Sequence, residues 1–263
     1  MVDIKDNVIP DGKWEFNEEV SNCFEDMLER SIPQYQVMRD AIFHIGVKIL
    51  EKSDSKNILD IGCSDGLNLE RFISKYGACA RYKGIDISKP MLEKVKTKFQ
   101  NLIKLNIVQI IDMDLRKDFP IDIYNIITSI FTIQFTPIEY RQKIIQNIYD
   151  KLKCGGAFLM VEKVLGNCHE LNEIMVDEYL NLKKENGYSQ DQLERKKLAL
   201  EGVLVPMTSN WNIDLLKQAG FKNLSSKLSL NIFYKKMANK QIRNALDNKY
   251  HFIDRCNIEI GDC

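Results

Sequence analysis

Acidic side chains at the ends of short apolar runs are the residues of this sequence best suited to hold a ligand. Asp86 closes the run RYKGID, and Asp114 follows the run IVQII at residues 107–111. A carboxylate at the end of a second parallel strand can accept both hydroxyls of a ribose. A carboxylate beside an apolar neighbour such as Leu115 can hold the edge and the face of an adenine. The pattern favours a nucleoside site, and the alternative for Asp86 is a cap for the helix that begins at Ser88.

A glycine turn lies about 20 residues before that ribose acid. The stretch NILDIGCSDG, residues 57–66, begins with an apolar run that contains Asp60 and continues through Gly62, Cys63 and Ser64. Glycine adopts positive φ readily and lets a backbone approach a ligand closely, and the start of the following helix attracts anionic groups. The turn and the acid together predict a nucleotide-sized docking point. A purely structural βα turn is the alternative reading of the glycines alone.

Short apolar runs alternate with helical periodicity around these residues. Buried strands are expected at residues 57–61, 81–86, 107–111, 121–129 and 157–161. Pro137 opens a helix toward Leu152, which the run from Lys153 to Gly156 is expected to terminate. The segment FTIQF, residues 131–135, should therefore lie at the carboxyl edge of the sheet, where open α/β proteins bind ligands. The order of elements predicts an α/β, Rossmann-like fold with a mainly parallel sheet covered on both faces.

The other segments are expected to surround or complete this core. Helices at 17–32 and 35–52 precede the first strand and cover the mouth of the site. A helical insertion, broken at Gly187, forms a lid or a partner surface, and its charged run at 194–197 is expected to be a solvated helical face. A helix at 210–219 precedes two final strands at 221–224 and 228–234, the last pair antiparallel. The expected boundaries are 1–52 for the N-terminal arm and helices, 53–165 for the core, 166–205 for the insertion, 206–236 for the final strands, and 237–263 for an unassigned tail.

The composition restricts the class of protein. The 263 residues carry 37 basic and 37 acidic side chains, so no global charge favours binding to nucleic acid or membranes. Seven cysteines without CxxC pairing or metal-ligand spacing favour free thiols and a cytoplasmic protein. No stretch resembles a signal peptide or a membrane span. His44 and His169 are isolated in the sequence, so a role as base or metal ligand is disfavoured and no metal is expected.

With these residues placed, the chain resembles the class I S-adenosylmethionine-dependent methyltransferases, and among them the carboxy-S-adenosylmethionine synthases. That family provides the cofactor for carboxymethylating a wobble uridine in tRNA. The matching segments run from Trp14 to about Phe233 and include WEFNEEV, FEDMLERSIPQY, ILDIGCS, GIDISKPMLE, FTIQF, IYDKLKCGGAFLMVEK, ENGYS and KQAGF. The resemblance implies a seven-stranded sheet, a homodimer, and cofactor contacts at Tyr35, Gly62, Cys63, Ser64, Asp86, Asp114 and Leu115.

Three positions depart from the family pattern. Lys197 stands where the family has an arginine that grips the carboxylate of the modified cofactor, and lysine lacks the planar fork that matches a carboxylate. Ile130 replaces an asparagine just before FTIQF and can neither donate nor accept a hydrogen bond. Ile87 replaces an asparagine beside the ribose acid, a milder change because a backbone amide there can still meet adenine. The departures weaken recognition of a carboxylated cofactor more than recognition of S-adenosylmethionine.

The sequence leaves three functions open. The first is methyl transfer from S-adenosylmethionine to a small molecule, such as an acid or keto acid, with Tyr35, Gln134 and Lys197 facing the acceptor. Tyr35 as a turn residue that only packs, and Gln134 as an amide that only satisfies backbone groups, are the alternatives for those side chains. The second function is the family's own reaction, with Lys197 in place of arginine. The third is a cofactor-binding subunit without chemistry.

Overall fold

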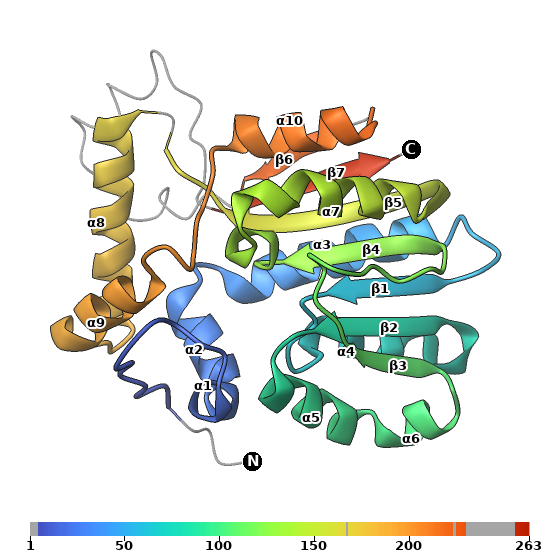
Figure 1. Ribbon diagram of the computed structural model, residues 1–263, viewed down its shortest axis with the longest axis horizontal. Coiled ribbons are helices and arrows are strands. Elements are labelled where there is room, and N and C mark those ends of the chain that lie inside the picture. The colour runs from blue at the N-terminus through green and yellow to red at the C-terminus, as the bar shows by residue number, and fades with distance from the viewer. Residues whose placement is uncertain (1–4, 167, 223–224, 230–255, 263) are drawn as a thin grey trace.

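A seven-stranded sheet forms the centre of the computed structural model, which describes residues 5–166, 168–222, 225–229 and 256–262 (Figure 1). Its strands are β1 (Asn57–Ile61), β2 (Arg81–Asp86), β3 (Val108–Asp112), β4 (Tyr124–Ile130), β5 (Leu152–Lys163), β6 (Ser225–Ser229) and β7 (Cys256–Asp262). They lie in the order β3-β2-β1-β4-β5-β7-β6. The first five are parallel, and β7 runs antiparallel to both β5 and β6. The predicted α/β fold with a mainly parallel sheet is confirmed.

Helices cover both faces of this sheet, and the strand residues alternate between the two resulting cores. On one face, α3 (Tyr35–Leu50), α4 (Leu67–Tyr76) and α5 (Lys89–Lys98) pack on residues such as Ile58 and Ile126. On the other, α7 (Ile138–Asp150) and α10 (Ser209–Ala219) pack on Leu59 and Ile127. These four strand side chains are fully buried, as parallel strands covered on both faces require. The short α6 (Gln100–Lys104) follows α5.

Several predicted element boundaries are wrong in instructive ways. The helix expected at 17–32 is two helices, α1 (Glu18–Asn22) and α2 (Phe24–Ser31), separated at Cys23. The run at 153–156 does not end α7 but belongs to β5, where the register with β4 shifts between Tyr124 and Ile126. Gly155, with φ of 75°, permits this irregularity in the strand. The two glycines therefore mark a bulge rather than a helix stop.

The last two strands also differ from expectation. Phe221 and Lys222 precede a strand instead of forming one, and β6 begins at Ser225. The expected strand at 228–234 overlaps the end of β6 and otherwise lies outside the described residues. The tail that had no assigned element supplies β7, the strand that joins β5 to β6. β6 pairs antiparallel with β7 from the tail, and the pairing expected between 221–224 and 228–234 lies largely outside the described residues.

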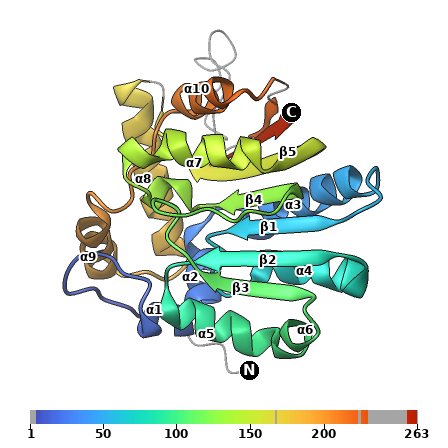
Figure 2. The same ribbon diagram turned by 45° about the vertical axis from the view of Figure 1, so that its right-hand side comes forward.

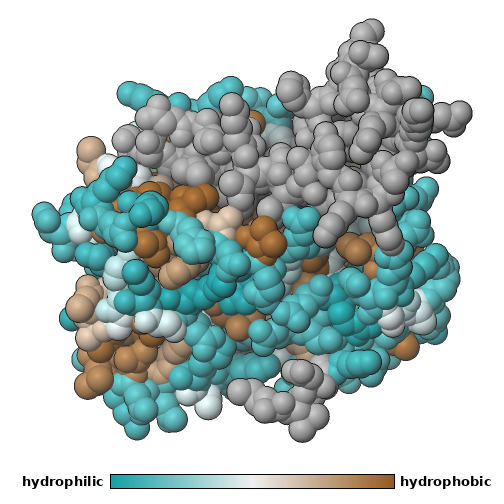
Figure 3. Space-filling view, turned by 180° about the vertical axis from the view of Figure 1, so that it is seen from behind, coloured by the Kyte–Doolittle hydropathy of each residue, from teal (hydrophilic) through white to brown (hydrophobic). Residues whose placement is uncertain are grey.

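The helical insertion stands over the carboxyl edge of the sheet. It consists of α8 (His169–Glu185) and α9 (Gln190–Leu200), and both views place it beside α2 (Figures 1 and 2). Ser189 and Gln192 form a reciprocal capping box that begins α9 just after Gly187, whose φ is 89°. No helix in the described part of the chain is long and apolar enough to cross a membrane. The surface seen from behind is mostly hydrophilic with scattered apolar areas (Figure 3).

Candidate active site

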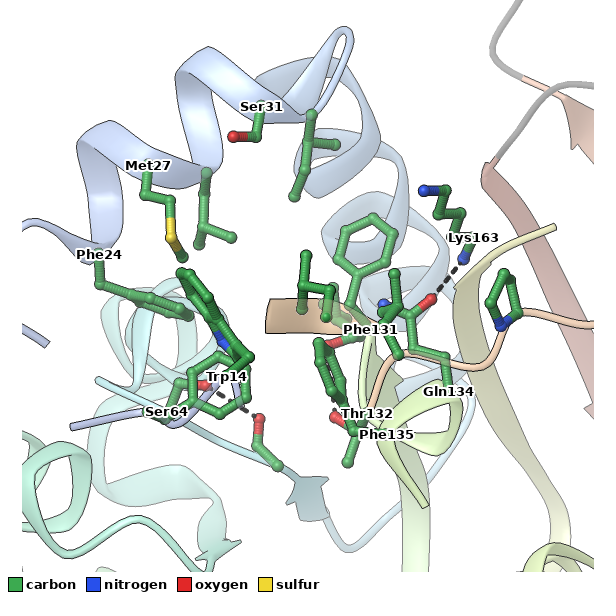
Figure 4. A pocket seen from close by; sticks show the side chains of 18 of the residues that line it. Trp14, Phe24, Met27, Ser31, Ser64, Phe131, Thr132, Gln134, Phe135 and Lys163 are labelled. Carbon is green, nitrogen blue, oxygen red and sulfur yellow. Dashed lines mark hydrogen bonds between the residues drawn. The ribbon is translucent and has the colours of Figure 1, made fainter. Parts of the chain in front are cut away.

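A cavity of about 880 Å³ lies at the carboxyl ends of the parallel strands, between the sheet and the helices α2, α8 and α9. Aromatic and apolar side chains from the N-terminal segment, including Trp14, Phe24 and Met27, face it from one side, and Gln134 and Lys163 face it from the other (Figure 4). The residues expected from the sequence to form the site all line this cavity: Tyr35, Asp60, Gly62, Cys63, Ser64, Asp86, Ile87, Asp114, Leu115, Ile130, Gln134 and Lys197.

Asp86 ends β2 and organises the backbone around it. One carboxylate oxygen accepts from the Ser64 amide at 2.9 Å, and the other accepts from the amides of Ile87 at 2.8 Å and Ser88 at 2.9 Å. Burial raises the pKa of Asp86, and these three hydrogen bonds oppose that increase. A carboxylate offers about four acceptor positions. One acceptor position therefore remains on Asp86, on the oxygen that accepts from the Ser64 amide, for a hydroxyl donor inside the cavity. The alternative role of Asp86, as the cap of α5, is filled by another residue. The Ser88 hydroxyl caps α5 by accepting from the Met91 amide.

The glycine turn is shaped by packing inside the protein. Gly62 has φ of 67°, and a Cβ built there would lie 2.1 Å from Oγ1 of Thr132. The amides of Gly62 and Cys63 both donate to the Ile85 carbonyl oxygen, at 2.8 and 3.0 Å. The contact with Thr132 and the positive φ alone account for the glycine. Gly62→Val would thus disturb the turn itself, beyond any effect on a ligand.

Asp60 lies beneath this turn and is buried. Its Oδ1 lies 3.0 Å from the Asn68 amide nitrogen, which donates to it, and 2.6 Å from Oγ1 of Thr128. Burial raises the pKa of Asp60 to about 7, and the nearby Asp86 adds to the increase. A group that titrates near neutral pH at the edge of the cavity makes cation binding there dependent on pH.

The end of the cavity beside β3 carries a polar and an apolar lining. Asp114 receives a two-pronged hydrogen bond from the Arg116 guanidinium, with N–O distances between 2.7 and 3.1 Å. That contact lowers the pKa of Asp114. Met113, Leu115 and the exposed Ile87 supply apolar surface next to it. A planar base and a ribose fit this set of carboxylates and apolar side chains.

Glu162, which sequence reasoning missed, fixes the FTIQF segment. It is buried at the end of β5, and its two carboxylate oxygens accept from the amides of Ile133 and Gln134 at 2.9 and 2.8 Å. Burial raises the pKa of Glu162 to about 8. In Gln134 the side-chain oxygen accepts from the Lys163 amide at 2.8 Å (Figure 4). The oxygen of Gln134 therefore satisfies a backbone group, as the structural alternative expected. The side-chain nitrogen of Gln134 makes no hydrogen bond among the described residues.

Tyr35 begins α3 and is buried, with 7% of its surface exposed. Burial raises its pKa, so the hydroxyl stays protonated at neutral pH. The Arg39 guanidinium lies 5.4 Å from the centre of the Tyr35 ring and donates to the Leu67 carbonyl oxygen at 2.8 Å. Tyr35 thus both packs and lines the cavity.

Basic side chains gather where the insertion closes the cavity. Lys197 is exposed, whereas the adjacent Lys196 is only 4% exposed and pairs with the buried Asp6. The prediction that 194–197 is a solvated face is therefore wrong for Lys196, because the N-terminal arm covers that side of α9. Lys163 and Lys183 also line the cavity, and neither was expected there from the sequence. A signal for Lys183 was present, because Tyr179 and Lys183 are four residues apart and so share one face of a helix.

Neither His44 nor His169 lines the cavity. His169 is exposed at the start of α8 and lies 3.3 Å from Glu173, and His44 packs beside Phe43 on α3. Among the described residues no three His, Cys, Asp or Glu side chains gather in a way that could hold a metal ion.

Comparison with known proteins places this architecture. A protein-family profile described as "Methyltransferase domain" matches residues 58–156. A carboxy-S-adenosyl-L-methionine synthase from Nautilia profundicola is 37% identical over 84% of this chain and 92% of the relative. A protein of the same name from Desulfotalea psychrophila is 34% identical over 86% of this chain and 93% of the relative.

Solved structures share the fold at low sequence identity. An O-methyltransferase family protein from Burkholderia thailandensis gives a TM-score of 0.60 at 13% identity, covering 93% of this chain and 59% of that protein. PigF, solved with SAH, gives 0.55 at 15% identity, covering 97% of this chain and 63% of that protein. The chain therefore spans about three fifths of the length of these structural neighbours. The predicted fold, the enzyme class and S-adenosylmethionine as cofactor are confirmed. The chain belongs to the carboxy-S-adenosyl-L-methionine synthase family of S-adenosylmethionine-dependent methyltransferase-fold enzymes.

Proposed function

We propose that this enzyme transfers the methyl group of S-adenosylmethionine to a small anionic acceptor, such as a carboxylic acid or keto acid. The observation that supports this most is the division of the cavity. Its β2 and β3 end presents the carboxylates Asp86 and Asp114, and its β4 and β5 end presents Lys163, Lys183 and Lys197. Carboxylates suit the ribose and the base, and ammonium groups suit an acidic acceptor.

The cofactor lies across the sheet edge in this proposal. Asp86 accepts a ribose hydroxyl, Asp114 and Leu115 hold adenine with Ile87 over its face, and Asp60 with the turn at 62–64 faces the amino-acid portion. S-adenosylmethionine, when bound, supplies an electrophilic methyl group on a positively charged sulfur. The chain positions the acceptor and excludes water from it. The insertion covers the acceptor end of the cavity, and Tyr35 and the amide nitrogen of Gln134 orient the acceptor. Holding reacting atoms about 3 to 3.5 Å apart supplies much of such an acceleration.

Label transfer tests the proposal. The purified enzyme is incubated with S-adenosylmethionine labelled in its methyl group and with a panel of small carboxylic and keto acids, and products are separated by mass. We expect label in an acid product together with stoichiometric S-adenosylhomocysteine. Binding of S-adenosylmethionine without transfer to any of these acids, or to small molecules extracted from the host, would favour the non-catalytic subunit and contradict the proposal.

A second candidate is the activity in the relatives' name, formation of carboxy-S-adenosylmethionine. The relatives' identity over most of their length favours it. Lys197 at the rim of the cavity keeps one positive charge for a carboxylate on the cofactor. Against it, Ile130 offers that carboxylate no hydrogen bond, and an unmatched carboxylate in a water-poor site is costly.

A homodimer through the insertion is part of the same proposal. On the insertion, Ile174 of α8 is 54% exposed and does not line the cavity, and Leu198 of α9, which also lines the cavity, is 65% exposed. Isolated apolar side chains are common on surfaces, but here they lie on the segment that closes the site. A second subunit covering them would stabilise the closed insertion. The cytoplasmic location and the absence of direct nucleic-acid binding stay predictions from the sequence.

A further inference from the structure

A row of ammonium groups and phenol rings crosses the roof of the cavity. The Lys163 ammonium lies 5.0 Å from the centre of the Tyr179 ring, and the Lys183 ammonium lies 5.3 Å from the same ring. Lys183 also lies 5.1 Å from the ring of Tyr188, whose other neighbour is the Lys196 ammonium at 4.9 Å. Three cations from β5, α8 and α9 thus converge on two rings.

The middle cation of this row lacks an acidic partner. Lys196 pairs with Asp6, but Lys183 makes no hydrogen bond or ion pair with any residue that the structure describes. Lys183 is only 8% exposed and lines the cavity. A cation–π contact contributes roughly 0.5 to 2 kcal/mol. Burying an unpaired ion costs several kcal/mol, so the rings alone do not compensate for the burial of Lys183.

We infer that Lys183 is the anchor for the carboxylate of the acceptor, at a subsite of the cavity beside Tyr179 and separate from Lys197. That the bound carboxylate belongs to the acceptor rests on the proposed function. The existence of an anion subsite at Lys183 does not depend on catalysis. A carboxylate placed there completes the missing ion pair and lies between ammonium groups on two sides. The same contact makes Lys183 a specificity-determining residue that favours acids over their neutral analogues.

The electrostatic surroundings agree with this assignment. Burial lowers the pKa of Lys183 to about 8, and the positive charges of Lys196, Lys163 and Arg30 lower it while Asp6 opposes them. Tyr179 and Tyr188 complete the groups that face it, and burial raises the pKa of Tyr188 so that it stays neutral. A bound carboxylate would raise the pKa of Lys183, so acid binding should take up a proton and weaken as the pH rises through about 8.

Trace acetylation of the intact enzyme by acetic anhydride, resolved for each lysine by mass spectrometry, tests the inference without turnover. At pH 7 a lysine whose pKa is about 8 holds on the order of a hundred times more neutral amine than an ordinary lysine. Lys183 should therefore be labelled far faster than the exposed Lys184, the matched control on the same helix. Malonate should slow the labelling of Lys183 by about tenfold by restoring its charge, and uncharged malonamide should not.

Two outcomes would overturn the anchor. One is labelling of Lys183 that malonate does not slow, and the other is equal protection by malonate and malonamide. In methyl transfer, Lys183→Met should remove the preference for an acid over its amide. Calorimetry should show unchanged S-adenosylmethionine affinity in this variant. The control Lys184→Met should change neither the preference nor the affinity. Malonate protection in an enzyme that methylates no acid would overturn the proposed function and keep the anion subsite. Methyl transfer to an acid, without protection of Lys183 by malonate, would overturn the anion subsite and keep the proposed function.

Discussion

Asp86 has two separable tasks, because its carboxylate holds three backbone amides and also faces the cavity. Asp86→Ala would remove both, so loss of binding there would not distinguish a damaged turn from a lost ribose contact. Asp86→Asn keeps the shape of the side chain and one acceptor oxygen for the amides of Ile87 and Ser88, while its NH2 group replaces the oxygen that accepts from the Ser64 amide and has the free position for a ribose hydroxyl. It is the sharper substitution for the ribose assignment.

We expect Asp86→Asn to weaken S-adenosylmethionine binding by about 1.5 to 3 kcal/mol, the range for hydrogen bonds to a charged group. Isothermal calorimetry measures the affinity, and thermal unfolding checks that the fold persists. Asp112→Asn is the matched control, since Asp112 pairs with Asp86 in the sheet register but is exposed and does not line the cavity. Unchanged affinity in a folded Asp86→Asn enzyme would remove the ribose assignment.

The raised pKa of Asp60 predicts that S-adenosylmethionine affinity depends on pH. Its pKa, raised by burial to about 7, leaves it partly protonated at neutral pH, and the cationic cofactor favours its ionised form. Below about pH 7 binding must therefore release a proton, so S-adenosylmethionine affinity should fall as the pH is lowered from 8 to 6, approaching tenfold per pH unit at the acid end. Asp60→Asn should flatten this profile, although Asp86, whose pKa is also raised, contributes a residual slope at lower pH. An equally steep profile in the variant would exclude Asp60 as the titrating group.

The sequence predicted the cofactor end of the site better than the acceptor end. Asp86, Gly62 and Asp114 belong to contiguous strand–turn–helix units, so local order is enough to bring them to one edge. Lys183 and Glu162 owe their roles to segments distant in sequence: the lysine is buried by the folding of the insertion onto the N-terminal arm, and the glutamate by the FTIQF segment. Charge and periodicity do not show which face of a helix another segment will cover.

At the scale of elements, the N-terminal arm fastens the insertion over the cavity. Asp6 is fully buried and accepts from Lys196 and Tyr188, while its backbone contacts Asp26 and Arg30 of α2. Burial alone would raise the pKa of Asp6, but the hydrogen bonds from Lys196 and Tyr188 lower it below the ordinary value. The arm, α2 and the insertion are therefore joined through one carboxylate.

Asp6→Asn should loosen the insertion without unfolding the sheet. Removing one partner of a buried pair costs about 3 to 5 kcal/mol, and here that cost falls on the contact between the arm and α9. Hydrogen-exchange mass spectrometry should show faster exchange in residues 169–200 and unchanged protection of β1 and β4. Asp191→Asn is the control, because Asp191 pairs with Arg195 on the exposed side of the same helix. Unchanged exchange of the insertion in Asp6→Asn would show that other contacts hold it.

Helices and strands with strong periodicity were predictable, and irregular elements were not. The helices α3 and α10 lie within two residues of their expected bounds because their apolar stripes pack on the sheet. The break at Cys23 and the bulge near Gly155 depend on packing partners that a single sequence does not show. The strand β7 alternates apolar and polar residues, with Ile258 and Ile260 on either side of Glu259, but the run is short and its place in the sheet is set by pairing with β5 and β6.

At the scale of the whole molecule, the sheet order places the nucleoside end and the acceptor end on opposite sides of β1. The insertion reaches over the acceptor end and presents an outward surface beyond it. A homodimer formed through that surface should give twice the chain mass of 30.6 kDa in light scattering at micromolar concentration. Ile174→Asp should shift the protein toward monomer, and Ile121→Asp, on a residue 84% exposed and outside the insertion, should not. Only monomer in the unmodified protein would contradict the dimer.

We expect the enzyme to work with ordinary S-adenosylmethionine. In the proposed function, Ile130 and Lys197 leave an added carboxyl group poorly matched, while Asp86 and Asp114 bind the adenosine that both cofactors share. Mass spectrometry of the nucleotide released when the freshly purified protein is denatured tests this most directly, because the two cofactors differ by one carboxyl group. We predict S-adenosylmethionine or S-adenosylhomocysteine as the major species, and carboxy-S-adenosylmethionine as the major species would contradict the account and establish the relatives' named activity in its place.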